Sequence, residues 1–459
     1  MQVLITIVSL GVFCLLAEIF NLRKLLVPIT VIGLLAVLGI SLNLWSIDSS
    51  IDANYLNMMA TTKFSSAFSS LFIVLTIFIL LLSDDFYKDI PTKFSDFIAI
   101  KIFLLAGAVA MVSFTNLAMF FLGIEVLSIS LYILAASRRL DIKSNEAGMK
   151  YFLMGSFASG ILLFGICLVY GAMGSFDVTE ISELSQSAEL PIWFPIGIAL
   201  LTVGMFFKIA AVPFHFWAPD VYEGSPALTT ALMSTLAKVV AMATLYKLLS
   251  VMNADISEAY KMVIVAVSMA SMTVGNLMAL KQTNVKRMLA FSGISHAGFM
   301  LMTLLSLSTS ASSLLYYTTA YALSGIAAFS VILYVCKNKH NEDITNFHGL
   351  GKTHPFLAAV LTASLLSMAG IPIFAGFFAK LVLFTQTIEN GFIALVIVAV
   401  INSIISVGYY FKLILAMYTK ESNEERTGKP FLIYAVAFTA IALNIIIGMF
   451  PSLVLDLLG

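Results

Sequence analysis

Four ionisable residues occur near the middle of long apolar stretches of this sequence. They are Glu125, Lys208, Lys238 and Lys380. If these stretches cross a lipid bilayer, each charge costs about 2.5–3.5 kcal/mol on insertion scales, so the four together, with Glu treated as Asp, cost roughly 10–14 kcal/mol unless they are paired or hydrated. A purely structural helix bundle would not need them, and we therefore expect them to have a function.

The chemistry that a carboxylate and several lysines can perform in such surroundings is proton transfer. Burial disfavours the charged form of a lysine and a nearby carboxylate favours it, so a change in their separation can move a proton. We interpret Glu125 and Lys208 as part of a proton relay that also contains Lys238 and Lys380. The alternative is that Glu125 and Lys208 form a buried ion pair that only fixes helix packing.

Further ionisable residues lie nearer to the ends of their apolar stretches. Lys247, Lys101 and Glu18 are expected to reach the membrane interface with their charged ends. Lys150 and Lys412 also lie towards the ends of their stretches, where either an interface position or proton uptake would explain them.

Two histidines are candidates because imidazole can titrate near neutral pH. His296 lies among small residues inside an apolar stretch, and it is either a member of the relay or a packed, hydrogen-bonded side chain. His215 follows Pro213 at an expected helix interruption, which favours a hydrated, functional position.

The elements that carry these residues are predicted to be transmembrane helices. The chain has 459 residues, 60% hydrophobic and 11% charged, with a mean hydropathy of +1.00, whereas soluble domains are about 25% charged. About 20 apolar residues in a helix cross a bilayer. Blocks of this kind predict an all-α integral membrane protein with about 14 spans, at residues 3–20, 26–44, 66–83, 98–115, 117–136, 147–173, 192–212, 226–252, 259–280, 286–306, 311–336, 355–388, 391–418 and 430–450. The first block has no basic leading segment and no small-residue cleavage site, so it is expected to be retained.

Basic residues predict the orientation, because Lys and Arg concentrate in cytoplasmic loops. Sixteen lie in loops after odd-numbered spans, and only Lys63 and Lys261 lie in loops after even-numbered spans. Both termini are therefore predicted to face outside, which is the periplasm in a bacterial inner membrane.

Several other functions find no support in the sequence. The formal net charge is zero, so no basic excess suggests nucleic acid, and Cys14, Cys167 and Cys336 have no metal or disulfide spacing and are expected to pack. The sequence has no phosphate-binding glycine loop, nucleophile elbow or haem histidine pair, so no cofactor or metal is expected in this chain. The 36 Phe and 16 Tyr are expected to face lipid or to pack.

Two prolines predict internal symmetry. Pro213 and Pro372 each stand within a long apolar stretch, where proline interrupts a helix. Each belongs to the fourth span of a five-span unit, in spans 4–8 and spans 9–13. Because five is odd, the second unit enters the membrane from the opposite side, which predicts two inverted repeats with paired broken helices. The expected segments are an N-terminal three-helix segment at 1–97, repeats at 98–252 and 253–418, and a C-terminal loop and helix at 419–459.

At this point the sequence resembles a known family, the antiporter-like membrane subunits of complex I, and within it the N-type subunit of NADH:quinone oxidoreductase. The most specific stretches are FKIAAVPFHFWAPDVYEGSPALTTALMSTLAKVVA from Phe207, KRMLAFSGISHAG from Lys286, and DITNFHGLGKTHPFLAAVLTASLLSMAGIPIFAGFFAKLVLF from Asp343. An M-type subunit would have glutamate in the twelfth span where Lys380 stands, and an L-type subunit would continue into a long lateral helix. One departure is Ile373, where many relatives have a second proline.

The resemblance implies roles for individual residues. Glu125 and Lys208 would form a modulating pair, Lys238 would link two half-channels, and Lys380 would be the outward gate, while Lys150 corresponds to the lysine of the family's sixth span. The partners implied are the other membrane subunits of the complex, including an M-type subunit. NAD, FMN, iron–sulfur clusters and quinone would be bound elsewhere in the complex.

Three competing functions remain at this stage. A subunit of a multisubunit cation/proton antiporter would share the fold and the buried lysines. A substrate-carrying secondary transporter would suit the broken helices but not the excess of lysine over carboxylate, and an inert assembly scaffold would not need the buried charges.

Overall fold

The computed structural model describes residues 2–20, 22–43, 50–51, 57–87, 94–187, 190–252, 258–337, 339, 341–421 and 430–458. The first half of the chain forms α1 (Gln2–Ile19), α2 (Arg23–Asn43), α3 (Lys63–Phe86), α4 (Phe94–Ser113), α5 (Leu117–Ala135), α6 (Ile142–Met173), α7 (Val178–Ser187), α8 (Trp193–Ile209), α9 (Trp217–Gly224), α10 (Ala227–Leu232), the π-helical turn η4 (Met233–Ala237) and α11 (Lys238–Val251). A two-residue antiparallel pair, β1 (Ser50–Ile51) and β2 (Ala60–Thr61), precedes α3.

The second half is also helical. It forms α12 (Glu258–Leu280), α13 (Val285–Leu301), the 3₁₀ turn η5 (Met302–Leu305), α14 (Ala311–Val335), η6 (Ile344–Phe347), α15 (Leu350–Thr353), α16 (Pro355–Ala369), α17 (Ala375–Glu389), α18 (Ile393–Thr419), α19 (Phe431–Met449) and α20 (Ser452–Leu455). Polar residues begin several of the long helices. The side chains of Thr62, Asn116, Asp141 and Asn284 each accept a hydrogen bond from a backbone N–H in the first turn that follows, which satisfies donors that the helix itself leaves free.

The predicted number of spans agrees with the structure. Among the described residues, twelve helices are long and apolar enough to cross a membrane, with α10, η4 and α11 counted as one and α13 and η5 as another. Of the two remaining predicted spans, the seventh (192–212) corresponds to α8, which ends before Pro213 and is followed by α9, and the twelfth (355–388) is divided into α16 and α17.

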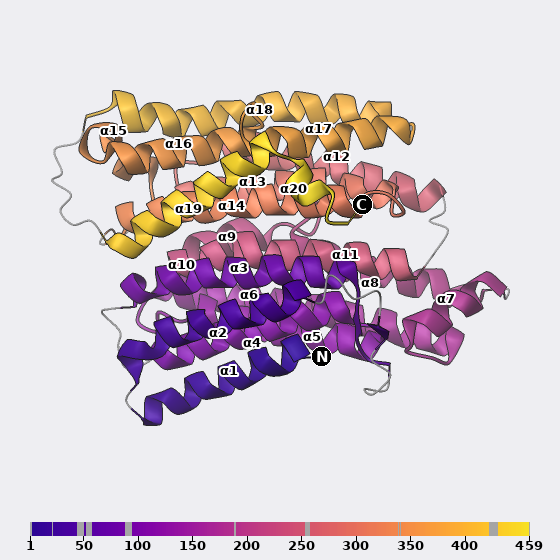
Figure 1. The fold of residues 1–459 in the computed structure, drawn as a ribbon. Helices are drawn as coiled ribbons and strands as arrows, with labels where there is room; N and C mark the ends of the chain where they lie inside the picture. The colour runs from indigo at the N-terminus through magenta and orange to yellow at the C-terminus, as the bar shows by residue number, and fades with distance from the viewer. Residues whose placement is uncertain are drawn as a thin grey trace.

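The helices lie side by side in one elongated bundle (Figure 1). In this view α1 and α2 lie at one edge, α16 to α18 lie at the other, and α3, α10 and α14 lie between them. Burial follows this order, because α14 is 94% buried over its apolar window whereas α1 is 28% and α18 is 39% buried. The outer helices therefore expose apolar side chains on the surface of the bundle, and α6 does so along much of its length.

Three expectations from the sequence need correction or comment. Cys14 and Cys336 are buried as expected, but Cys167 lies on the exposed face of α6. Lys101 and Lys247 were expected at the interface but are buried, as the next section describes. Of the loop residues used to predict orientation, Lys88, Lys93, Arg426 and Lys429 lie outside the described residues, as does the side chain of Lys24.

Candidate functional site

The interruption of the seventh span places Lys208. Helix α8 ends in a Schellman motif, in which Ala210 adopts φ 59° and the N–H groups of Ala210 and Ala211 donate to the carbonyls of Phe207 and Phe206. Pro213 follows between α8 and α9. Lys208 therefore stands in the last turn of α8, where its Nζ donates to Ser128 Oγ on α5 at 2.8 Å and to Ser159 Oγ on α6 at 3.3 Å.

Glu125 lies on α5 one turn before Ser128. It is half-buried, and its buried Oε1 has no hydrogen-bond partner within the described part of the chain. Among the described residues, no ion pair within 4.0 Å joins Glu125 to Lys208. The serine hydroxyl therefore makes the direct contact with the lysine, and this arrangement differs from the contact ion pair considered as the packing alternative.

Lys238 is placed by a distorted turn and by a missing side chain. The π-helical turn η4 ends immediately before it, and such turns often occur at functional sites. Lys238 is 3% exposed, and its Nζ has no hydrogen-bond partner among the residues that the structure describes. A Cβ at Gly293 on α13 would lie 2.7 Å from this Nζ and 3.1 Å from Tyr321 Oη. Glycine at position 293 therefore leaves the space that the ammonium group occupies.

The interruption of the twelfth span places Lys380 in a similar way. Helix α16 also ends in a Schellman motif, with Gly370 at φ 88°, and Pro372 follows before α17. Lys380 Nζ donates to the carbonyl of Ala369 at 2.8 Å and lies 4.9 Å from the centre of the Phe299 ring. The carbonyl of Ala369 at the end of α16 has no hydrogen-bond donor within its own helix, and the Lys380 ammonium group donates to it instead.

Ile373, the departure from the family pattern, has φ 88°. A proline ring holds φ near −65°, so a second proline at this position would need a different backbone.

A small cavity joins Lys380 to His296. Its volume is about 10 Å³, and its lining includes His296, Tyr317, Tyr321, Ser324, Ser367 and Lys380. This is close to the smallest volume that holds one water molecule. His296 is 5% exposed, and its Nδ1 and Nε2 lie 2.8 and 3.3 Å from the hydroxyls of Tyr317 and Tyr410. The histidine is therefore packed and hydrogen-bonded, and it also lies at the edge of a polar cavity.

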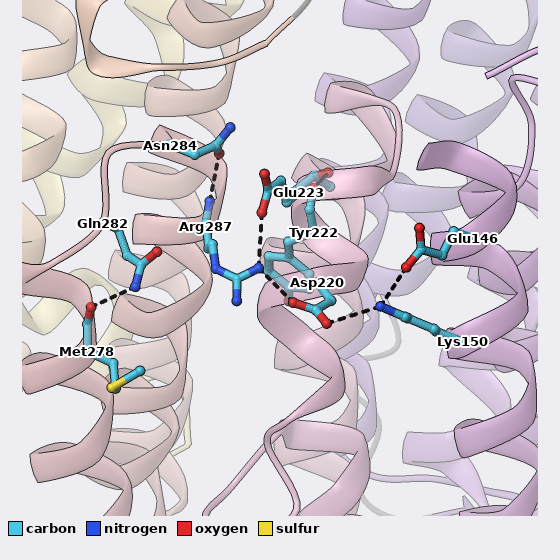
Figure 2. A network of polar contacts seen from close by, with 10 residues as sticks. Glu146, Lys150, Asp220, Tyr222, Glu223, Met278, Gln282, Asn284 and Arg287 are labelled. Atoms are coloured by element: carbon cyan, nitrogen blue, oxygen red, sulfur yellow. Dashed lines mark hydrogen bonds and ion pairs between the residues drawn. The ribbon is translucent and has the colours of Figure 1, made fainter. Parts of the chain in front are cut away.

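Lys150 belongs to a different environment, shown in Figure 2. It is 44% exposed and contacts Glu146 at 2.7 Å and Asp220 on α9 at 3.2 Å. Arg287 of α13 contacts the same Asp220 at 2.6 Å and Glu223 at 3.0 Å. We call these five residues the exposed ion-pair network, and it links α6, α9 and α13 at one end of the bundle.

Other residues considered from the sequence are placed as follows. Lys101 is 1% exposed and donates to Ser83 Oγ at 3.0 Å, and Lys247 donates to the Val112 carbonyl near the end of α4 at 2.7 Å. The sequence predicts an interface location for both because they lie near the ends of apolar stretches. However, α4 begins at Phe94, so Lys101 lies well inside that helix, and neighbouring helices cover both lysines. Glu18 is half-buried and paired with Arg23, and Lys412 donates to the Gln282 carbonyl. His215 is buried, and its Nδ1 has no hydrogen-bond partner among the described residues.

The sequence reasoning missed several polar contacts. Ser128, Ser159, Gly293 and the tyrosines around His296 were not singled out, and the tyrosines were assigned to packing or lipid contact. Hydroxyl groups spaced along apolar helices were the available signal, but only the packing of α13, α14 and α18 shows which of them meet.

Comparisons with known proteins agree closely. Residues 114–406 match the family model described as NADH:quinone oxidoreductase/Mrp antiporter, TM. The chain is 73% identical to the NADH-quinone oxidoreductase subunit N of Flavobacterium johnsoniae and 62% identical to that of Flavobacterium psychrophilum, and each match covers 100% of both chains.

Solved structures have the same fold. A chain of respiratory complex I from Thermus thermophilus superposes with a TM-score of 0.85 at 28% identity, with 99% of this chain and 98% of that chain covered. A chain of an archaeal membrane-bound sulfane sulfur reductase gives a TM-score of 0.89 at 25% identity, with 100% and 96% covered. A chain of the Mrp complex from Dietzia gives 0.85 at 21% identity, with 99% and 94% covered, which shows the fold alone.

Proposed function

This chain belongs to the family of NADH:quinone oxidoreductase and Mrp antiporter membrane subunits, and we propose that it translocates protons as the N-type subunit of an NADH:quinone oxidoreductase. The observation that carries the proposal is the position of three lysines inside the bundle, at two helix breaks and a π-helical turn. Lys238 and Lys380 are buried, and Lys208 is half-buried. Lys208, Lys238 and Lys380 each lie in the bundle without a contact ion pair among the described residues. Lysines in such surroundings can exchange protons because burial disfavours their charged form.

The contacts support the order of a path along the bundle. Lys208 meets the hydroxyl of Ser128, which lies one turn from Glu125. Lys238 Nζ and Tyr321 Oη both border the space at Gly293, and Tyr321 also lines the cavity shared by His296 and Lys380. Water between these groups would complete the path, with Glu125 favouring the protonated form of Lys208 and Lys380 serving as the outward gate.

We also propose that residues 98–252 and 253–418 are inverted repeats. Both broken helices end in the same Schellman motif, at Ala210 and at Gly370. The contact between α4 and α5 also matches the contact between α12 and α13. A Cβ at Gly107 would touch the carbonyl O of Gly123 and the backbone N of Leu127, and a Cβ at Gly275 would touch the carbonyl O of Phe291 and the backbone N of Ser295.

These matching contacts align α5 with α13 residue by residue. Gly123 is then equivalent to Phe291, Glu125 to Gly293, and Ser128 to His296. In one repeat a broken-helix lysine meets Ser128, and in the other Lys380 shares a cavity with His296.

The setting of the chain follows from the same proposal. Both termini would face the periplasm of a bacterial inner membrane, and the partners would be other membrane subunits, including an M-type subunit. NAD, FMN, iron–sulfur clusters and quinone would be bound by other subunits. The Mrp-type antiporter is the second candidate, and the 73% identity to a relative named NADH-quinone oxidoreductase subunit N favours the first. Co-purification with flavin- and iron–sulfur-bearing subunits would distinguish them.

The proposal is tested by Lys208→Ala in the assembled complex. Proton uptake into membrane vesicles is driven by NADH, normalised to assembled complex and compared with quinone reduction. We expect uptake to fall sharply while assembly survives. Lys352→Ala is the control, because Lys352 is 68% exposed and pairs only with Glu421 among the described residues. Normal uptake by an assembled Lys208→Ala complex would assign Lys208 to packing.

A further inference from the structure

A chain of four hydrogen-bonding side chains passes through His296. Tyr317 Oη lies 2.8 Å from His296 Nδ1, Tyr410 Oη lies 3.3 Å from His296 Nε2, and Ser292 Oγ lies 2.6 Å from Tyr410 Oη. The four residues come from α13, α14 and α18, and each is 5% exposed or less. We call them the tyrosine–histidine chain.

Every member of this chain can donate one hydrogen bond and accept another. A hydroxyl does both, and a neutral imidazole donates from one nitrogen and accepts at the other. The chain therefore has two polarities, and passage of one proton converts one polarity into the other. The neighbouring Tyr409 differs, because its hydroxyl donates to the amide oxygen of Asn276 at 3.0 Å. An amide group does not relay protons in this way, because its oxygen only accepts hydrogen bonds and its nitrogen only donates them.

The two ends of the chain lie at different places. At one end Tyr317 lines the water-sized cavity that Lys380 also lines. At the other end Ser292 lies five residues along α13 from Arg287, which is about 7.5 Å at the rise of a helix. Arg287 belongs to the exposed ion-pair network of Figure 2, which includes the carboxylates of Asp220 and Glu223. The chain therefore extends from the lysine towards the helix end where exposed carboxylates lie.

We infer that Tyr317 and Tyr410 are relay residues that hold His296 by both ring nitrogens and pass protons between Lys380 and the Ser292 end of α13. This inference rests on the proposed proton translocation. It adds a branch to the path, in which α14 and α18 each supply one hydroxyl to a histidine on α13.

The proton balance of one passage is simple. A proton from Lys380 reaches the oxygen of Tyr317 through water in the cavity, and Tyr317 gives its own proton to His296 Nδ1. His296 gives its Nε2 proton to Tyr410, Tyr410 gives its proton to Ser292, and Ser292 gives its own proton to water, which carries it towards the carboxylates of Asp220 and Glu223. Lys380 loses one proton and the water gains one, each of the four residues of the chain keeps its number of protons, and reorientation of the hydroxyls and the imidazole restores the first polarity. Passage in the opposite direction uses the same bonds.

The test removes single hydroxyls and keeps the rings. Tyr317→Phe and Tyr410→Phe are compared with Tyr316→Phe, whose residue is adjacent to Tyr317, is fully buried, and donates to the Ile447 carbonyl at 3.0 Å. A backbone carbonyl cannot relay a proton, so this variant matches the lost hydroxyl without touching the chain. NADH-driven proton uptake per assembled complex is measured in vesicles, in H₂O and in D₂O.

We expect Tyr317→Phe and Tyr410→Phe to pump protons about tenfold more slowly than the parent, which is less than the full contribution of a positioned proton-transfer group. Their solvent isotope effect on proton uptake should be larger than that of the parent. Tyr316→Phe should pump at the parent rate. If Tyr410→Phe does not assemble, Ser292→Ala removes the last hydroxyl of the same chain and should show the same loss.

The outcomes separate the inference from the function on which it rests. Parent-rate uptake by Tyr317→Phe and Tyr410→Phe, together with loss in Lys208→Ala, would overturn the inference and leave the proposed function intact. Equal losses in all three phenylalanine variants would also overturn it, in favour of packing. Normal uptake by Lys208→Ala would instead overturn the proposed function itself.

Discussion

The ammonium group of Lys238 occupies the space that a side chain at Gly293 would fill, because a Cβ built on Gly293 lies 2.7 Å from Lys238 Nζ. The contact joins α11 of one proposed repeat to α13 of the other. Among the described residues no hydrogen-bond partner holds the Lys238 ammonium group in another position.

We therefore predict that Gly293→Ala displaces the Lys238 side chain and lowers proton uptake by about tenfold, because small misplacement of a reacting group is costly. The complex should still assemble, since the clash involves the flexible end of a lysine. Gly171→Ala on α6 is the control, because a Cβ there meets nothing within 4 Å. Unchanged uptake by Gly293→Ala would show that Lys238 can move without functional loss.

Glu125→Gln should lower NADH-driven proton uptake without preventing assembly. The substitution keeps the shape of the side chain but removes the negative charge that favours a protonated Lys208. Glu421→Gln provides a matched control, because Glu421 is 82% exposed and pairs with Lys352. Equal uptake by the parent and Glu125→Gln would contradict a modulating role for this carboxylate.

Ser128→Ala should also slow uptake, but less than Lys208→Ala. Ser128 Oγ accepts the shorter of the two hydrogen bonds from Lys208. Without the Ser128 hydroxyl, Lys208 can still donate to Ser159 and to water. A hydrogen bond to a charged group contributes roughly 1.5–3 kcal/mol, and only part of that energy would be lost, so we expect proton uptake to decrease by a few-fold. Ser130→Ala on the same helix is the control, because Ser130 Oγ donates to the Val126 carbonyl of its own helix and has no other partner in the described part of the chain. A decrease as large as that of Lys208→Ala would mean that Ser128 is itself essential to the path.

Arg287→Gln should loosen the contact between α9 and α13 while changing global stability little. Exposed ion pairs contribute about 0–1 kcal/mol each, and Arg287 is 31% exposed and shared between Asp220 and Glu223. Hydrogen–deuterium exchange should rise in α9, whereas the thermal midpoint of the complex should move by no more than a few degrees. Exchange in α9 equal to that of the parent would show that the network does not hold this helix.

A reporter domain fused after Lys143 should lie in the cytoplasm, and one fused after Glu183 should lie outside. The physical basis is the concentration of Lys and Arg in loops after odd-numbered spans. Protease accessibility in intact and broken cells measures the two positions. The reversed pattern would overturn the orientation of the whole chain, because the number of spans between the two sites is odd.

The sequence by itself determined the class of the protein and the number of its spans. The length of an apolar stretch is a local property, because the roughly 20 residues that cross a bilayer must form their backbone hydrogen bonds within their own helix. The fourteen stretches can therefore be counted without knowing which helices lie next to them. The two interruptions could be predicted for the same reason, because proline removes a backbone donor wherever it stands. The lysines near the middle of spans stood out because apolar sequence surrounds them.

Only the tertiary structure decided which side chains meet. Lys101 and Lys247 lie near the ends of apolar stretches in the sequence, yet both are buried because neighbouring helices cover them. Whether Glu125 contacts Lys208 directly, and whether Tyr410 reaches His296, depends on the rotation and spacing of helices far apart in the chain. The apolar pattern along a buried helix is nearly uniform around its circumference, so it does not specify which face meets which neighbour, and that choice comes from the fit of all the side chains together.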